Sequence, residues 1–346
     1  MTPLLRVENL TVGIKKEKRF LTAVDDISFD IQAGEILGIV GESGCGKSLT
    51  ALSIPALLPE AAAIKTGKIL FNGVDLRALS QQKLYHIRGR EISMVFQEPV
   101  PSLNPLLKIG RQIAEPLVLH GETDRVTVKR QVLDIMRILG LREPDRIIEA
   151  YPHQLSGGMC QRVMIALAII CKPKLLIADE PTTALDVTIQ AQILDLMKKI
   201  NRELGTSILF ISHDLSVINR LCDNVQVMYA GKLVEGGTAA DVFTRPVHEY
   251  TRGLIGSIPA RDRKGRALAS IPGKVPSLEE KSPAGCPFAP RCAHAQKRCF
   301  DEFPAKTIVD SVTIENSAAL VNSSGNRAAH QVHCILAEPE ANHAGA

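Results

Sequence analysis

The feature that most constrains this chain is a glycine-rich segment near its N-terminus, Gly41-Glu42-Ser43-Gly44-Cys45-Gly46-Lys47-Ser48. It follows an apolar run, Ile36–Val40, and it opens a stretch with helical character, Ser48–Leu58. Strand, glycine loop and helix in this order, ending in Lys-Ser, are typical of a loop that wraps phosphate groups. Glycines let successive backbone N–H groups point inward, and the helix N-terminus adds its dipole. The segment predicts a nucleotide-phosphate site.

The residue types within this loop predict how a triphosphate is held. We expect Gly41 through Leu49 to contact the nucleotide. The Lys47 ammonium would reach the β- and γ-phosphates, and the Ser48 hydroxyl would ligate Mg²⁺.

A second apolar run, Leu175–Ala178, ends in two carboxylates, Asp179 and Glu180. An Asp-Glu pair after a strand is by itself more often a helix cap or a solvated turn. With the phosphate loop upstream, the pair fits a different chemistry, in which Asp179 serves Mg²⁺ and Glu180 polarises an attacking water. Loop and acidic strand together predict a nucleoside triphosphatase.

The order of apolar runs and helical stretches predicts an α/β fold with a mostly parallel sheet, that is, a P-loop NTPase core. The expected strands lie at Ile36–Val40, Ile92–Phe96, Leu175–Ala178, Ile208–Ile211 and Val225–Met228. Between about residues 80 and 168, prolines break the chain into short helical pieces such as Thr127–Leu139. We therefore expect an ATPase domain over residues 1–255 with a helical subdomain at about 80–168, and a C-terminal extension over 256–346.

Composition excludes several classes of protein. No apolar stretch approaches the ~18–20 residues of a membrane span, and the N-terminus lacks the pattern of a signal peptide. A net charge of +4 does not show whether the protein binds a membrane surface or a nucleic acid. An aromatic content of 4% with no Trp argues against a base-stacking surface. We expect an intracellular protein whose eight cysteines are thiols or metal ligands.

A further serine-glycine segment narrows the class of ATPase: Leu155-Ser156-Gly157-Gly158-Met159. It stands before a predicted helix over Met159–Ile170, where a hydroxyl and free N–H groups form another anion site. A simple helix cap would explain the local structure equally well. However, one ATP does not need two such helix ends from one chain, so we expect this one to serve an ATP held by a second subunit.

With these motifs, the chain resembles the ABC ATPase family. The resemblance implies four further site residues: Gln97 as a glutamine that senses Mg²⁺ and faces the membrane subunits, Asp186 in a loop that crosses to the opposite monomer, His213 as the histidine that contacts the γ-phosphate, and Phe20 as the aromatic that stacks on adenine. It also implies that Glu180, His213 and Gln97 act in catalysis, and that Ser48, Gln97 and Asp179 hold Mg²⁺.

The residues around the motifs are similar to those of the peptide/nickel branch of that family. The element Arg245-Pro-Val-His-Glu-Tyr-Thr251 is similar to that branch as well. This resemblance implies an ATPase that drives di- or oligopeptide uptake, located at the cytoplasmic face of the inner membrane. The implied partners are a related, non-identical ATPase subunit, two membrane permeases and, indirectly, a solute-binding protein, with no nucleic acid. Nickel, opine or glutathione import, or a non-transport ABC ATPase, are the alternatives.

Four cysteines lie in the C-terminal extension, with 5, 6 and 34 residues between them: Cys286, Cys292, Cys299 and Cys334. These spacings match neither zinc ribbons nor the bacterial ferredoxin pattern, so they leave a metal centre and free thiols equally open. The resemblance to peptide-transporter ATPases implies a 4Fe–4S cluster on these cysteines. His294, His330 and His333 are alternative ligands that would make a zinc site instead.

Overall fold

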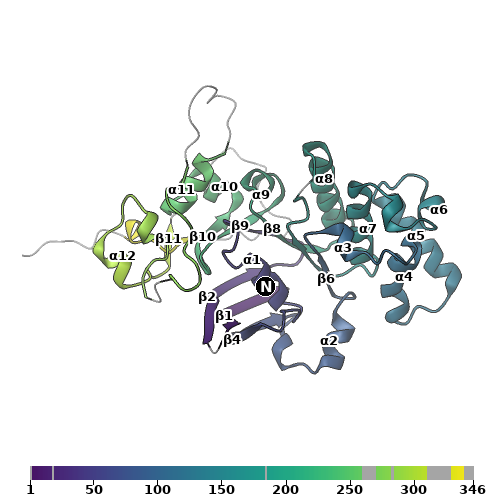
Figure 1. The fold of residues 1–346 in the computed structure, drawn as a ribbon, viewed down its shortest axis with the longest axis horizontal. Coiled ribbons are helices and arrows are strands. Elements are labelled where there is room, and N and C mark those ends of the chain that lie inside the picture. Colours follow the sequence, from purple (N-terminus) through teal and green to yellow (C-terminus); the bar gives the residue numbers. More distant parts are fainter. Residues whose placement is uncertain are drawn as a thin grey trace, which may run out of the picture.

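The protein is described here by a computed structural model that covers residues 2–17, 19–183, 185–258, 270–281, 284–309 and 329–338. Two β-sheets and a group of helices make up the fold (Figure 1). The expected α/β class is correct, and an antiparallel sheet that the sequence did not predict lies against the parallel one.

The larger sheet has eight strands in the order β11-β12-β10-β9-β3-β8-β7-β6. Its parallel part contains all five strands expected from the sequence: β3 (Ile36–Val40), β6 (Ile92–Val95), β7 (Leu175–Asp179), β8 (Ser207–Ser212) and β9 (Asn224–Tyr229). Every residue of β3, β7, β8 and β9 is buried. Strands covered on both faces must be apolar throughout, which is why they appear as continuous runs in the sequence.

The carboxyl ends of these parallel strands meet at one edge of the sheet and position the site. The phosphate loop follows β3 and leads into α1 (Lys47–Ser53). Asp179 ends β7, and His213 directly follows β8. Because β8 lies between β3 and β7, the three segments are neighbours at this edge.

One face of the larger sheet packs against the antiparallel sheet. That sheet has the order β2-β1-β4-β5 and consists of β1 (Leu5–Lys16), β2 (Arg19–Ile31), β4 (Ala62–Phe71) and β5 (Val74–Asp75). Its inward side chains, such as Val12, share one apolar cluster with Ile39 of β3 and Ile211 of β8. Side chains alternate between the faces of a strand, so the neighbouring residues Val40 and Phe210 belong to the opposite cluster.

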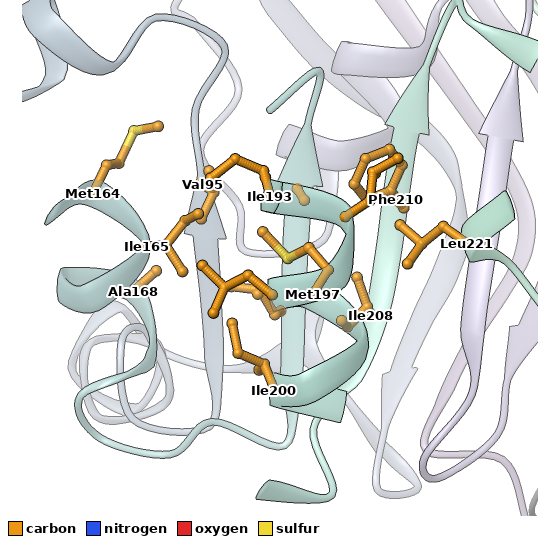
Figure 2. Packing of buried hydrophobic residues seen from close by; sticks show 14 of the residues in the cluster. Val95, Met164, Ile165, Ala168, Ile193, Met197, Ile200, Ile208, Phe210 and Leu221 are labelled. Atoms are coloured by element: carbon orange, nitrogen blue, oxygen red, sulfur yellow. The ribbon is translucent and has the colours of Figure 1, made fainter. Parts of the chain in front are cut away.

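Helices cover the other face of the larger sheet. Figure 2 shows Ile165 of α7 (Gly157–Ile169) and Met197 of α8 (Val187–Leu204) beside Phe210 and Val95 of the sheet. The strip of apolar residues on α8 (Ile193, Met197 and Ile200) recurs at helical spacing, as expected for a helix lying on a sheet. A third helix, α9 (Leu215–Leu221), follows β8.

The region expected to be a helical subdomain contains α2 (Gln81–Ile87), α3 (Pro99–Ser102), α4 (Ile109–Leu119), α5 (Arg125–Ile138), α6 (Pro144–Ile147) and α7. Strand β6 interrupts it and pairs with β7, so part of this stretch belongs to the core sheet. Prolines occupy the first helical positions of α3 and α6, where their missing N–H costs nothing. Helices α4, α5 and α6 extend away from the sheets, while α7 returns to the core sheet (Figure 1).

The C-terminal extension continues the core sheet. After β10 (Lys232–Thr238), α10 (Ala239–Thr244) and α11 (Glu249–Gly256), the chain adds α12 (Lys297–Asp301), β11 (Thr307–Val309) and β12 (His330–Val332). Strand β12 pairs with β10, and His330 Nε2 forms a fully buried hydrogen bond of 2.8 Å with Glu235 Oε1 of β10. None of the helices within the described residues is long and apolar enough to cross a membrane.

Candidate functional site

The phosphate loop opens into a cavity of about 800 Å³ at the carboxyl edge of the parallel strands. Its lining includes seven of the nine predicted loop residues, three predicted catalytic residues and four others: Glu42, Ser43, Gly44, Gly46, Lys47, Ser48, Leu49; Gln97, Glu180, His213; Ile14, Ala23, Thr183, Leu278. Of the two remaining loop residues, Gly41 needs to be glycine, because a Cβ there would lie 2.0 Å from the Met228 carbonyl oxygen. Cys45 is fully buried behind the loop.

The Lys47 side chain folds back over the phosphate loop. Its ammonium donates to the carbonyl oxygens of Gly41 at 2.8 Å and Glu42 at 3.1 Å, and it lies 3.9 Å from Glu180 Oε1. The side chain is 4% exposed, so its charge acts in a medium of low dielectric. A cation held at the centre of the loop in this way is suited to bind the outer phosphates of a nucleotide.

Two oxygens suited to Mg²⁺ are adjacent. The Ser48 hydroxyl donates to Asp179 Oδ1 at 3.1 Å. Burial raises the pKa of Asp179, and the neighbouring Glu180 charge adds to this effect, while the Ser48 hydrogen bond opposes it. A divalent cation bound here would stabilise the ionised form of the carboxylate. The predicted magnesium residues Ser48 and Asp179 are thus brought together, with Gln97 on the wall of the same cavity.

The three predicted catalytic residues meet on one carboxylate. Glu180 Oε2 accepts hydrogen bonds from His213 Nδ1 at 2.9 Å, from Thr183 Oγ1 at 2.9 Å and from Gln97 Nε2 at 3.4 Å. Glu180 adopts a left-handed backbone conformation with φ +48°, which costs energy for a side chain with a Cβ. This conformation and the three donors hold the carboxylate beside the phosphate loop, where it can orient a water.

One predicted nucleotide-binding residue, Phe20, lies outside the cavity. Phe20, predicted to stack on adenine, does not line the described cavity. Its side chain is 47% exposed, and the Lys65 ammonium lies 3.0 Å from its ring centroid. The aliphatic side chains of Ile14 and Leu278 line the cavity instead. Sequence reasoning missed Leu278 because it comes from the C-terminal extension, and only the tertiary fold brings it there.

The serine-glycine segment lies apart from this cavity. Ser156 caps α7 by accepting the Met159 N–H at 3.4 Å, as a plain cap would. Ser156 and Gly157 are exposed, and a Cβ on Gly157 would meet nothing within 4 Å. Leu155 and Met159 line a different cavity of about 620 Å³. None of the five segment residues is among those described as lining the nucleotide cavity of the same chain.

Asp186 caps the next helix. Its Oδ1 accepts the N–H groups of Thr188 at 3.0 Å and Ile189 at 2.9 Å, at the start of α8. Ile189 also packs against Gly158, where a Cβ would approach its Cγ2 to 3.2 Å. The loop with Asp186 is therefore adjacent to the serine-glycine segment. Ala184, in the same loop, lies outside the described residues.

The four cysteines of the extension line one small cavity of about 20 Å³, together with His248, Glu249 and His294. Burial raises the pKa of Cys286 to about 11, and burial also raises the pKa of Cys292 and of Cys334. No three His, Cys, Asp or Glu side chains in the described ranges are arranged to hold a metal ion.

Of the three histidines predicted as alternative ligands, only His294 lines the cysteine cavity. His330 Nε2 is held by Glu235, and His333 Nδ1 lies 3.0 Å from the Pro304 carbonyl oxygen. Both of these histidines therefore serve the packing of the extension. His248, which belongs to the element Arg245–Thr251 and was not predicted as a ligand, approaches Cys286 Sγ to 4.0 Å.

Comparison with known proteins agrees with this geometry. Residues 24–183 match the family model of the ABC transporter, and residues 234–299 match that of the oligopeptide/dipeptide transporter C-terminal region. Bacillus subtilis dipeptide transport ATP-binding protein DppD is 44% identical, over 99% of this chain and 98% of that protein. Escherichia coli oligopeptide transport ATP-binding protein OppD is 46% identical, over 87% of this chain and 89% of that protein.

Among solved structures, the dimeric ATP-binding cassette MJ0796 bound to ADP and Pi is similar, with a TM-score of 0.62 and 28% identity. The match covers 68% of this chain and 98% of the cassette. A relative that is 44% identical over nearly the whole of both chains leaves no doubt about the relationship. The chain belongs to the ABC transporter family of ATP-binding proteins, in the branch that carries the oligopeptide/dipeptide transporter C-terminal region.

Proposed function

We propose that this protein hydrolyses ATP to drive the uptake of di- or oligopeptides through a membrane transporter. The observation that carries the proposal is that Lys47, Ser48 and Glu180 line one cavity, with Asp179 hydrogen-bonded to Ser48. The chain's relatives are named for dipeptide and oligopeptide transport. The ATPase chemistry follows from the site, while the cargo follows from the relatives.

The proposed reaction uses the side chains in their described positions. Lys47 and the loop N–H groups bind the phosphates, and Ser48, Asp179 and Gln97 are the residues that would hold Mg²⁺. Glu180 polarises the water that attacks the γ-phosphorus, and the leaving group is ADP. His213 holds Glu180 in place and contacts the γ-phosphate. The mutual hydrogen bonds around Glu180 Oε2 support these roles.

The proposed assembly has a second ATPase subunit, related but not identical, facing this one. Its serine-glycine segment would complete the nucleotide cavity described here, and Ser156–Gly158 would complete the partner's. The exposure of Ser156 and Gly157 supports this arrangement. Asp186, beside the segment, would contact the partner. Two membrane permeases would receive the motion through the Gln97 region at the cytoplasmic face of the inner membrane, and a solute-binding protein would deliver the peptide.

We assign the ATPase domain to residues 1–255, with the helical subdomain at about 80–168, and the extension to 256–346. Within the extension, Cys286, Cys292, Cys299 and Cys334 would hold a 4Fe–4S cluster. The support for this is that all four cysteines line one cavity, since such a cluster is held by four thiolates. The described side chains are not arranged to hold a metal ion, so the four thiols would have to shift on binding. The cluster's chemistry here would be structural cross-linking of the extension. Iron and sulfide analysis after anaerobic purification tests this assignment, and zinc without iron would refute it.

The transport function is tested by reconstituting the full chain with its permeases and binding protein in proteoliposomes. We expect ATP hydrolysis to be stimulated by a peptide-loaded binding protein, with uptake of labelled dipeptide. Glu180→Gln should abolish both activities. Stimulation by a nickel chelate or an opine in place of peptides would contradict the cargo, and stimulation by DNA or ribosomes would contradict transport altogether.

A further inference from the structure

A single arginine joins the cysteine-bearing extension to the phosphate loop. Arg291 Nη1 donates to Glu42 Oε2 at 2.8 Å, and its Nη2 donates to Glu42 Oε1 at 3.3 Å. Glu42 is the second residue of the loop and lines the nucleotide cavity. We propose that the extension completes the ATP site of its own chain, with Arg291 as the positioning residue that orients Glu42 and neutralises its charge. The inference rests on the proposed use of ATP in this cavity.

The contact is built into the fold and is not a surface ion pair. The Arg291 side chain is only 6% exposed. Its remaining donors are used as well: Nε donates to the Pro272 carbonyl oxygen at 2.7 Å, and Nη1 also donates to the Tyr229 hydroxyl at 3.2 Å. A bidentate guanidinium–carboxylate pair with further partners is strong and fixed in direction, unlike an exposed pair.

Aromatic residues fix the geometry on both sides of this pair. The Tyr250 hydroxyl accepts the backbone N–H of Glu42 at 2.9 Å, so side chain and main chain of Glu42 are both held. Tyr229, Tyr250 and Phe288 contact one another with ring centroids 4.6 to 5.4 Å apart. Arg291 lies 5.7 Å from the Tyr229 ring and 5.9 Å from the Phe288 ring. Phe288 lies in the extension and the two tyrosines lie in the ATPase core, so this aromatic cluster joins the two parts.

The electrostatic need for Arg291 follows from the chemistry of the cavity. A triphosphate is highly anionic, and Glu42, one of the residues that line its binding site, carries a carboxylate. Like charges at short range in a partly buried site oppose binding strongly. The guanidinium of Arg291 cancels this charge. An arginine side chain does not lose its proton in proteins, so the guanidinium stays charged beside Glu42.

The position of Arg291 in the sequence makes this contact dependent on the cysteine cavity. Cys292 follows it directly, and Cys292 lines that cavity with the three other cysteines. The Arg291 N–H also donates to the Phe288 carbonyl oxygen at 2.9 Å, within the same short turn. Whatever fixes Cys292 therefore fixes the guanidinium that reaches the phosphate loop.

The experiment is a pair of substitutions that separates charge from folding. Affinity of the full chain for the non-hydrolysable analogue AMP-PNP with Mg²⁺ is measured for the wild type, Arg291→Met, and Arg291→Met with Glu42→Gln. We expect Arg291→Met to weaken binding about tenfold or more, since it leaves the half-buried Glu42 carboxylate unpaired near the phosphates. The added Glu42→Gln should recover most of that loss, because it removes the uncompensated charge.

The matched control is Arg298→Met, which removes an arginine of the same extension that pairs with Glu302 and Glu338 on the surface. Its affinity should stay within about twofold of the wild type. Unchanged affinity in Arg291→Met, or a double variant no tighter than the single one, would overturn the inference. If Arg291→Met does not fold, Arg291→Lys, which keeps the charge but loses the fork, is compared with and without Glu42→Gln. A wild-type chain that fails to bind the analogue would instead refute the proposed function itself.

Discussion

At the scale of single residues, the site depends on one carboxylate with several partners. Glu180 Oε2 accepts from His213, Thr183 and Gln97, which come from three different segments of the chain. The resemblance to the ABC ATPase family implies two of these partners, His213 and Gln97, and each of them follows a strand of the core sheet. It does not predict Thr183, because a threonine three residues after the glutamate has no distinguishing local signal.

We expect Glu180→Gln to lower the rate of ATP hydrolysis by at least about 100-fold while nucleotide binding persists. The amide keeps the size of the side chain but cannot take a proton from water. Hydrolysis by the full chain, measured as phosphate release, checks this, with Glu203→Gln at the exposed end of α8 as the control. Wild-type phosphate release from the Glu180→Gln protein would remove this residue from its role.

Leu278→Ala should raise the KM for ATP about threefold to fivefold with little change in kcat. Leu278 lines the apolar end of the nucleotide cavity with Ile14, and truncation removes apolar surface that a base would cover. The control is Val126→Ala, at a valine that is 76% exposed on α5. An unchanged KM would mean that the base lies elsewhere, and Phe20→Ala would then be the next variant to measure.

At the scale of elements, the sequence predicts well where burial is complete and less well elsewhere. The strands β3, β7, β8 and β9 are apolar throughout and were predicted closely. Helix α1 ends at Ser53 and not at Leu58, since Pro55 cannot continue it. The long strands β1 and β2 were missed, because exposed polar residues and register shifts interrupt their alternation.

Ser156→Ala and Asp124→Ala form a matched pair at two helix N-termini. Ser156 caps α7, and Asp124 caps α5 by accepting the N–H groups of Val126 and Thr127. Each loss should reduce the free energy of unfolding by about 1 kcal/mol, measured by urea denaturation. Only Ser156→Ala is expected to reduce ATP hydrolysis as well, because the proposed nucleotide site of the partner subunit would lose the Ser156 hydroxyl. Equal hydrolysis by both variants would leave Ser156 as a cap and nothing more.

At the scale of the whole molecule, the extension expected over residues 256–346 contributes strands to the core sheet and is not a separate unit. Strand β12 pairs with β10, and Arg291 reaches the phosphate loop. Neither contact has a local signature, because each joins residues far apart in the sequence. The four cysteines were predicted as a group from composition and resemblance, and the fold does bring them to one cavity.

His330→Ala should lower the free energy of unfolding by about 3 kcal/mol. The substitution removes a fully buried hydrogen-bond partner of Glu235. Among the described residues, the N–H groups of Val247 and His248 then remain on this carboxylate. His86→Ala, at an exposed histidine of α2, is the control. The two midpoints are compared by urea denaturation, and equal midpoints would show that the pair contributes nothing to docking of the extension.

The pairing of β12 with β10 also has a consequence for biosynthesis. The buried His330–Glu235 contact joins residues 95 positions apart. At roughly 5–20 residues per second, a ribosome needs on the order of 5 to 20 seconds to make the intervening chain. During that time the outer edge of β10 has no neighbour and can pair with another nascent chain. We therefore expect the yield of folded protein to depend more on translation speed and chaperone supply than on the stability of the finished fold.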